Sequence, residues 1–203
     1  MIFLIRHGQT ALNHSKVVQP FDTPLDATGK EQAARLGAYL QEKGIRRILC
    51  SDQDRALMTA RPLEQLSGVD VETIEDLRER NFGDIRGQAY ADLKVNIFAP
   101  DYHPPGGETH QFFKERVARG WQTVTRVAGE LRAEGPDGTL AVITHGLVIA
   151  AILEHHVSRE DGLPRKIRHN ASISTIESEP PFRLLEANAI HHLENRPGAG
   201  GVV

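Results

Sequence analysis

The sequence predicts an α/β fold with a mainly parallel sheet, and three observations support this. Apolar runs with strand character alternate with amphipathic helical patterns along the 203 residues, as is typical of βαβ units. The length suits one domain with a full core, and we expect that domain to span residues 1–197. Hydrophobic residues make up 39% and charged residues 25% of the chain, which is ordinary for a globular protein.

The first third of the chain predicts a strand, a loop and a helix. Residues 2–6 form a short apolar run that indicates the first strand. Turn-forming residues then mark a loop over 8–27. Thr28 and Glu31 fit a capping box, which predicts a helix from there to about Lys43.

The second strand is expected at about 46–50, followed by a helix over 53–67. Asp52 or Asp54 can cap this helix at its start. Pro62 lies inside the helical pattern, and we expect it to kink the helix or to divide it into two pieces.

A weaker strand signal covers 69–74, and residues 78–107 then show no strong periodicity. A segment of this length without clear structure is usually functional and often forms a lid. A long helix is predicted over about 109–133, then a strand over 139–143 and a short helix over about 147–156.

The end of the chain predicts a β-hairpin. Two β runs at 172–178 and 182–187 flank Pro180 and Pro181, which mark the turn. The tail 198–203 is expected to be disordered.

Composition excludes several kinds of site and partner. The formal net charge of −3 gives no general attraction to nucleic acid or to an anionic membrane. The single cysteine, Cys50, rules out an internal disulfide, and the adjacent pairs among the ten histidines lack metal-ligand spacing. No stretch approaches the roughly 20 apolar residues of a membrane span. We therefore expect a cytoplasmic protein without metal, cofactor, nucleic-acid or membrane partner.

Predicted parallel strands end in side chains that suit an anion. Arg6 and His7 follow the first strand, Arg55 lies one helical turn beyond the end of the second, and His145 follows strand 139–143. Open α/β sheets bind ligands in the crevice outside the carboxyl ends of their strands. The four side chains therefore predict a site for an anionic, phosphoryl-containing group.

A set of motifs occurs in a fixed order along the chain. They are Leu4-Ile5-Arg6-His7-Gly8-Gln9-Thr10 with Asn13, Pro24-Leu25 with Gly29, Ser51-Asp52 with Arg55-Ala56, Leu77-Arg78-Glu79 with Phe82-Gly83, Pro105-Gly106-Gly107-Glu108 and Thr144-His145-Gly146. In order and spacing they resemble the histidine phosphatase superfamily, also called phosphoglycerate mutase-like, over roughly residues 2–195. The resemblance implies a three-layer α/β/α sandwich whose mainly parallel central sheet has an antiparallel strand near one edge.

The resemblance also implies a metal-independent phosphatase acting on a small phosphorylated substrate. His7 would attack phosphorus as a neutral imidazole and form a phosphohistidine, and the charges of Arg6 and Arg55 would disfavour its protonation. Arg6, Arg55 and His145 would hold the phosphoryl oxygens. Asn13 could donate to the same oxygens, although turn chemistry alone explains an asparagine there.

Glu79 would be the general acid that protonates the leaving oxygen and then the base that activates water. A bound phosphate would raise the pKa of this carboxyl toward that task. Glu75, Asp76 and Asp84 lie close by and stay alternatives. Glu108 could line the entrance or cap the long helix.

Two other functions remain open. A phosphoglycerate mutase-type isomerase would return the phosphoryl group to its substrate, but the segment 80–105 is shorter than mutases usually carry there. A non-catalytic phospho-ligand-binding protein would lack a chemical residue, and all five are present. Five basic side chains could make the mouth of the site positive, or could simply be solvated: Arg78, Arg80, Arg86, Lys94 and His103. Trp121 and the Phe residues are interpreted as core packing.

Overall fold

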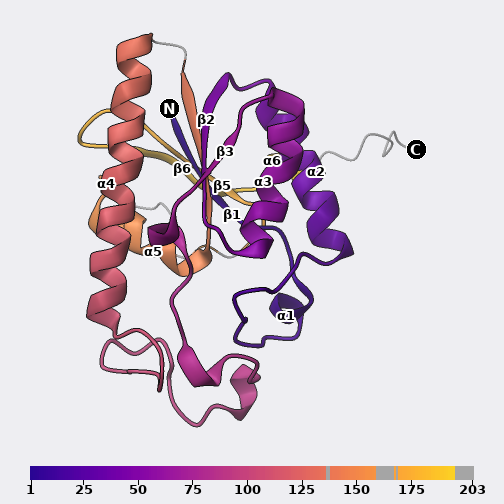
Figure 1. The fold of residues 1–203 in the computed structure, drawn as a ribbon, viewed down its shortest axis with the longest axis vertical. Coiled ribbons are helices and arrows are strands. Elements are labelled where there is room, and N and C mark those ends of the chain that lie inside the picture. The colour runs from indigo at the N-terminus through magenta and orange to yellow at the C-terminus, as the bar shows by residue number, and fades with distance from the viewer. Residues whose placement is uncertain (136–137, 159–166, 168, 195–203) are drawn as a thin grey trace, which may run out of the picture.

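The protein forms one six-stranded sheet between two layers of helices, in a computed structural model that describes residues 1–135, 138–158, 167 and 169–194 (Figure 1). The strands lie in the order β3-β2-β4-β1-β5-β6. They are β1 (Ile2–Arg6), β2 (Ile45–Cys50), β3 (Val71–Thr73), β4 (Thr139–Thr144), β5 (Ile173–Ile176) and β6 (Leu184–Ala189). The first four run parallel, and β5 is antiparallel to both β1 and β6. The predicted mainly parallel sheet with an antiparallel strand near one edge is confirmed.

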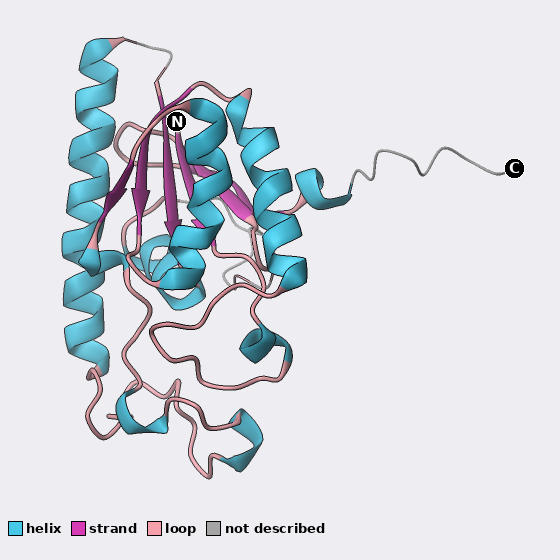
Figure 2. Ribbon diagram, turned by 45° about the vertical axis from the view of Figure 1, so that its right-hand side comes forward, coloured by secondary structure: helices cyan, strands magenta, loops and turns pink. Residues whose placement is uncertain are grey.

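Helices cover both faces of the sheet (Figure 2). One face carries α2 (Ala27–Gln41) and α3 (Asp54–Ser67), and the other carries α4 (His110–Glu134) and α5 (Gly146–His155). Alternate residues of β4 divide between the two cores, since successive strand side chains point to opposite faces. β4 is buried along its whole length, which is why its sequence is a continuous apolar run rather than an alternating one.

Shorter elements complete the chain. They are the α1 turn (Ala11–His14), the α6 turn (His191–Glu194) and the 3₁₀ turns η1 (Glu75–Leu77), η2 (Gly83–Ile85) and η3 (Tyr90–Asp92). Among the described residues no helix is both long and apolar enough to cross a membrane. The tail 198–203, and with it the end of the predicted domain, lies outside the described residues.

Both predicted helix caps are wrong. α2 begins at Ala27, because the Asp26 carboxylate accepts a hydrogen bond from the Gly29 amide at 2.7 Å. The cap residue of α3 is Gln53, whose side chain makes no capping hydrogen bond. Asp52 does not cap α3 because its carboxylate is held by the guanidinium of Arg78.

Pro62 does not divide α3, which runs without interruption from Asp54 to Ser67. The neighbouring helix explains this continuity. A Cβ built on Gly37 of α2 would lie 3.0 Å from Pro62, so the two helices are in close contact at the proline. Packing between the helices therefore holds α3 together where its own hydrogen bonding is weakest.

The loop after β1 is fixed against α2 by two glycines in contact. A Cβ on Gly29 would lie 2.0 Å from the Gln9 carbonyl oxygen, and one on Gly8 would lie 2.7 Å from the Gly29 carbonyl oxygen. In both cases the added Cβ would clash with backbone atoms, so neither position has room for a side chain. This contact sets the path of the chain directly after His7.

We expect Gly29→Ala to lower the free energy of unfolding by about 1–3 kcal/mol, because the methyl group would push the loop away from α2. Gly129→Ala is the matched control, since the nearest atom to its Cβ is 3.9 Å away in helix α4. That control should raise stability by up to about 1 kcal/mol through helix propensity. Urea unfolding measures both, and equal shifts would contradict the close contact.

Candidate active site

The carboxyl ends of β1, β2 and β4 meet at one edge of the sheet, and a cavity of about 850 Å³ lies there. Arg6, His7, Arg55 and Glu79 line this cavity. His145 is fully buried and is not among the lining residues, but its imidazole centroid is 5.2 Å from that of His7. The structure thus brings all five predicted catalytic residues together.

His7 is held as a neutral imidazole. Its Nδ1 lies 2.7 Å from the Gly8 carbonyl oxygen, which can only accept, so Nδ1 carries the proton and Nε2 keeps a lone pair. The side chain is 2% exposed. Burial, followed by the charges of Arg55 and Arg6, lowers the pKa of His7 well below its ordinary value.

His145 is oriented by a serine that had no predicted role. Its Nε2 lies 2.8 Å from the Ser51 Oγ, and its Nδ1 is buried without a hydrogen-bond partner among the described residues. Ser51 Oγ also accepts from the Gln53 amide at 3.4 Å. When the Ser51 hydroxyl donates to Nε2, the proton of His145 sits on Nδ1. Burial and the charge of Arg55 lower the pKa of His145 well below its ordinary value.

Arg55 is clamped by the loop between β1 and α2. Its Nη1 donates to the carbonyl oxygens of Pro20 and Phe21 at 3.0 and 3.3 Å, and its Nη2 donates to the Gln53 side chain at 2.9 Å. The residue is 1% exposed, and burial lowers the pKa of Arg55 to about 10. The guanidinium therefore stays charged at neutral pH in a fixed orientation.

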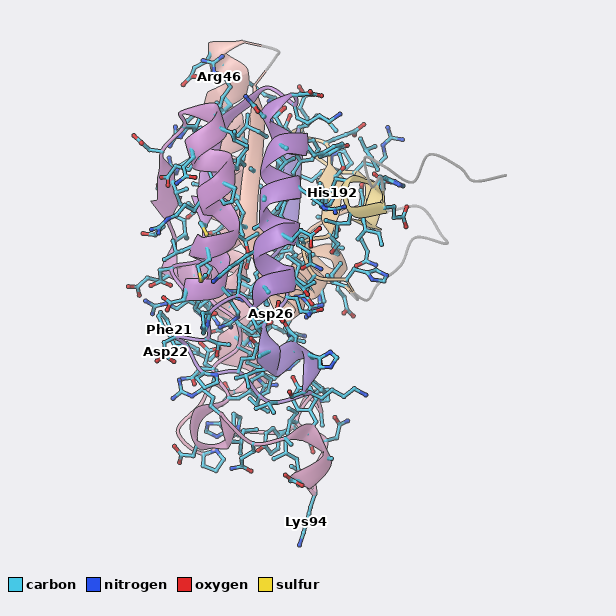
Figure 3. The ribbon with its side chains drawn as sticks, turned by 90° about the vertical axis from the view of Figure 1, so that its right-hand side faces the viewer. Phe21, Asp22, Asp26, Arg46, Lys94 and His192 are labelled. Carbon is cyan, nitrogen blue, oxygen red and sulfur yellow. The ribbon has the colours of Figure 1, made fainter. Side chains whose placement is uncertain are left out.

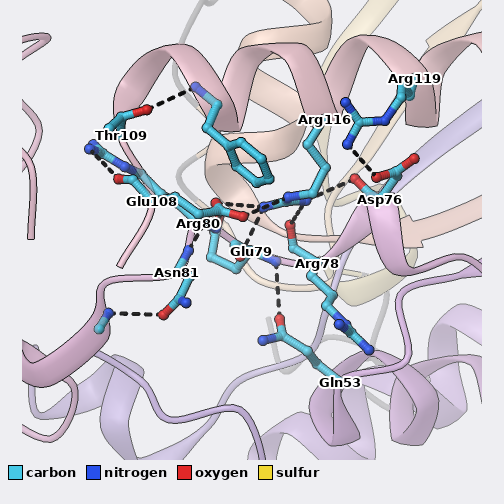
Figure 4. Close-up of polar contacts among 12 residues, drawn as sticks. Gln53, Asp76, Arg78, Glu79, Arg80, Asn81, Glu108, Thr109, Arg116 and Arg119 are labelled. Atoms are coloured by element: carbon cyan, nitrogen blue, oxygen red, sulfur yellow. Dashed lines mark hydrogen bonds and ion pairs between the residues drawn. The ribbon is translucent and has the colours of Figure 1, made fainter. Parts of the chain in front are cut away.

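Glu79 lies beside Arg116 of α4, whose Nη2 donates to the Glu79 carbonyl oxygen at 3.3 Å (Figure 4). Its carboxylate accepts from the Leu147 amide, at the start of α5, at 3.2 Å, and from the Arg80 amide at 3.0 Å. Its own amide donates to the Gln53 side chain, which also binds Arg55. Burial raises the pKa of Glu79, against the lowering effect of these amides and of Arg55 and Arg6. Gln53 thus joins Glu79 to Arg55, and no sequence signal marked it.

A family model described as "Histidine phosphatase superfamily (branch 1)" matches residues 2–188. The chain belongs to the histidine phosphatase superfamily. It is 28% identical to the uncharacterized phosphatase PhoE of Bacillus subtilis over 95% of this chain and 96% of that protein. It is 30% identical to a fructose-2,6-bisphosphatase TIGAR of Xenopus tropicalis, over 84% and 68% of the two chains.

The solved structure of Bacillus stearothermophilus YhfR superposes with a TM-score of 0.79 at 25% identity, covering 95% of this chain and 98% of that one. The predicted resemblance and the three-layer fold are therefore confirmed. The chain is an enzyme that hydrolyses phosphate esters and acts on a small phosphorylated substrate.

The other carboxylates near Glu79 in this phosphatase are engaged elsewhere. Asp76 binds Arg119 at 3.2 Å, and Glu75 binds Arg78 at 3.1 Å. Asp84 is not among the residues that line the cavity. These contacts favour Glu79 over the three alternatives as the acid.

Asn13 serves the turn and also lines the cavity. Its Oδ1 accepts from the Thr10 amide and from Asn170 Nδ2 at 3.1 Å. Asn170 also donates to the carbonyl oxygens of His7 and Gly8, and no sequence signal marked it. Asn170, far along the chain, thus holds the side chain of Asn13 where it lines the cavity.

Glu108 lines the cavity and does not cap α4, because Thr109 is the cap residue. Its carboxylate binds Arg116 through two hydrogen bonds of 2.8 and 2.9 Å. Arg116 in turn donates to the backbone oxygens of Asp76 and Arg78. This buried pair fixes the segment that carries Glu79.

Only three of the five basic side chains considered for the mouth of the site line the cavity. Arg78, Arg80 and Arg86 line the cavity, whereas Lys94 and His103 do not. Lys94 extends from the far end of the molecule, away from the sheet (Figure 3).

The aromatic prediction is confirmed for Trp121, which is 5% exposed, and wrong for several phenylalanines. Phe98 and Phe112 are about half exposed and line the cavity together with Phe21. Across the described ranges, no three His, Cys, Asp or Glu side chains are grouped as a metal would require. Metal independence of the reaction stays a prediction.

We expect the phosphatase to lose stability as the pH falls from about 7 to about 5. His7 and His145 have lowered pKa values when folded, so below about pH 6.5 the unfolded chain binds more protons than the folded one. Urea unfolding across this range measures the loss. A double variant, His7→Gln with His145→Gln, should lose less, whereas the exposed control His14→Gln should behave as the wild type. Equal losses in all three proteins would contradict the neutral buried imidazoles.

Proposed function

We propose that this enzyme hydrolyses phosphate monoesters through a phosphohistidine at His7. The observation that carries the proposal is the hydrogen bond from His7 Nδ1 to the Gly8 carbonyl, which leaves the Nε2 lone pair available at the cavity. Arg6 and Arg55 beside it keep the imidazole neutral and bind the phosphoryl group that it attacks. A neutral nucleophile next to fixed cations is what transfer of a phosphoryl dianion requires.

In the first step His7 Nε2 attacks phosphorus and the bond from phosphorus to the ester oxygen breaks. Arg6, Arg55 and the Nδ1–H of His145 stabilise the charge that spreads over the three equatorial oxygens. Glu79 gives its proton to the leaving oxygen, which departs as the alcohol. The raised pKa of Glu79 supports this protonated starting state.

In the second step Glu79, now a carboxylate, takes a proton from water as the water oxygen attacks phosphorus. The bond from phosphorus to His7 Nε2 breaks, so inorganic phosphate leaves and the imidazole returns to its neutral form. One residue acts first as acid and then as base, and the cycle closes without a cofactor.

Hydrolysis is favoured over the mutase reaction by the short cover of the cavity. A mutase must hold a bisphosphorylated intermediate and exclude water, which takes a closing segment. Between Arg80 and Pro105 this chain has only the 3₁₀ turns η2 and η3 and no α-helix. Water therefore has access to the phosphohistidine.

We expect His7→Ala to abolish both turnover and covalent labelling by a radioactive phosphate ester. The exposed His14→Ala is the matched control and should retain both. Product analysis with 3-phosphoglycerate and a trace of its bisphosphate should show inorganic phosphate appearing faster than the isomer. Labelling that survives in His7→Ala would refute the nucleophile assignment, and faster isomer formation would favour the mutase.

We expect Glu79→Gln to slow hydrolysis of alkyl phosphates about 10² to 10⁴-fold and to slow aryl phosphates of low leaving-group pKa much less. An alkoxide needs a proton to leave, whereas such a phenolate needs little help. Glu75→Gln, on the rim of the same cavity, should show no such contrast. Steady-state kcat on the two ester types measures the effect, and equal losses on both would make Glu79 a structural residue.

A further inference from the structure

Aromatic rings form part of the lining of the cavity. Phe98 stands edge-on to Phe82 and to Tyr90, with ring centroids 6.1 and 6.0 Å apart. Phe98 is 49%, Tyr90 43% and Phe112 51% exposed, and all three line the cavity. A grouped set of exposed apolar rings is unfavourable in water and marks a surface that a ligand covers. We call Phe82, Tyr90, Phe98 and Phe112 the aromatic wall.

Part of the aromatic wall is held firmly by backbone hydrogen bonds to the loop that follows β1. Gly87 donates to the Val18 carbonyl at 2.7 Å, Val18 donates to the Gln88 carbonyl at 2.9 Å, and Tyr90 donates to the Lys16 carbonyl at 2.9 Å. The ring of Tyr90 is thereby kept near Glu79 and Arg6, and burial, followed by the charge of Glu79, raises the pKa of its phenol. A preformed wall binds a ligand at a lower entropy cost than a mobile one.

The arginines of the same cavity are matched by partners within the protein. Arg78 binds Asp52 and Glu75, Arg116 binds Glu108 at 2.8 Å, and Arg119 binds Asp76 at 3.2 Å.

Arg80 and Arg86 have no carboxylate partner among the described residues. The Nη atoms of Arg80 donate to the backbone oxygens of Ile97, Tyr102 and Glu108, and the Nε of Arg86 donates to the Gly83 carbonyl oxygen at 2.9 Å. In the described part of the cavity, a second phosphate beyond the reaction centre would compete with these partners. It would also meet the negative charges of Glu75, Asp76 and Glu108. The outer cavity is therefore suited to an uncharged group.

We propose that the aromatic wall is a leaving-group subsite that selects monophosphate esters of apolar, ring-bearing alcohols over bisphosphates. The subsite rests on the proposed function, because the ester is oriented by its phosphoryl group at His7. The ring of the alcohol lies against Phe98 and Tyr90, where ring pairs add to the effect of area burial. Leu147 and Ala150 supply an apolar surface from α5 in the same cavity.

The test compares three esters of the same primary alkoxide type: phenylpropyl phosphate, propyl phosphate and propanediol bisphosphate. We expect kcat/KM to be about tenfold higher for the phenylpropyl ester than for the propyl ester, and lowest for the bisphosphate. Phe98→Ala should remove about that factor for the phenylpropyl ester and leave the propyl ester unchanged. Val95→Ala is the matched control, since Val95 is 53% exposed on the same segment and does not line the cavity.

A binding measurement keeps this result separate from the fate of the proposed mechanism. Calorimetry with phenylpropylphosphonate and propane bisphosphonate, which cannot be hydrolysed, should show tighter binding of the first, lost in Phe98→Ala. Preference for the bisphosphate or bisphosphonate, or an equal loss on all three esters in Phe98→Ala, would overturn the subsite and leave hydrolysis at His7 standing. Absence of any hydrolysis or labelling would instead remove the mechanism, and the phosphonates would still decide the subsite.

Discussion

The burial of Arg55 is the interaction on which the rest of the site depends. A guanidinium that is 1% exposed needs partners inside the protein, and three oxygens from two segments accept from its Nη atoms, while its Nε has no partner among the described residues. Two of these are backbone oxygens of the loop after β1, so the buried charge ties that loop to α3. The third belongs to Gln53, which also receives the amide of Glu79. The buried charge of Arg55 thereby sets the relative positions of the loop after β1, Gln53 and Glu79.

The same charge determines the protonation of its neighbours. Burial and the two neighbouring guanidiniums lower the pKa values of both imidazoles, so His7 and His145 stay neutral. His7 donates from Nδ1 to a carbonyl, and with Ser51 donating to Nε2 of His145 the second ring carries its proton on the same atom, Nδ1. His7 then presents an Nε2 lone pair and His145 an Nδ1 proton, and the proposed reaction uses both. Arg6 and Arg55 give this part of the cavity positive charge, which suits the phosphoryl dianion of the proposed reaction.

We call the part of the cavity lined by Arg6, His7 and Arg55 its cationic floor. The arginines of this floor and those near the aromatic wall have different kinds of partner. At the floor, Arg55 is held by neutral oxygens and keeps its charge for a ligand. Further out, Arg78, Arg116 and Arg119 are each matched by carboxylates. Arginines of one cavity thus have different roles according to their partners. In our proposals the floor binds the phosphoryl group and the aromatic wall contacts the alcohol attached to it.

The sequence by itself determined the sheet, the helices on it and the convergence of Arg6, His7, Arg55 and His145, because apolar periodicity is local and parallel strands end at one edge. It did not determine helix caps or side-chain partners. Asp52 was expected to cap α3 but binds Arg78, whereas Asp26, which had no predicted role, caps α2. The roles of Ser51, Gln53 and Asn170 and the exposure of Phe98 were decided only by the tertiary structure. Each depends on a residue or cavity brought near from elsewhere in the chain, and no local pattern records that proximity.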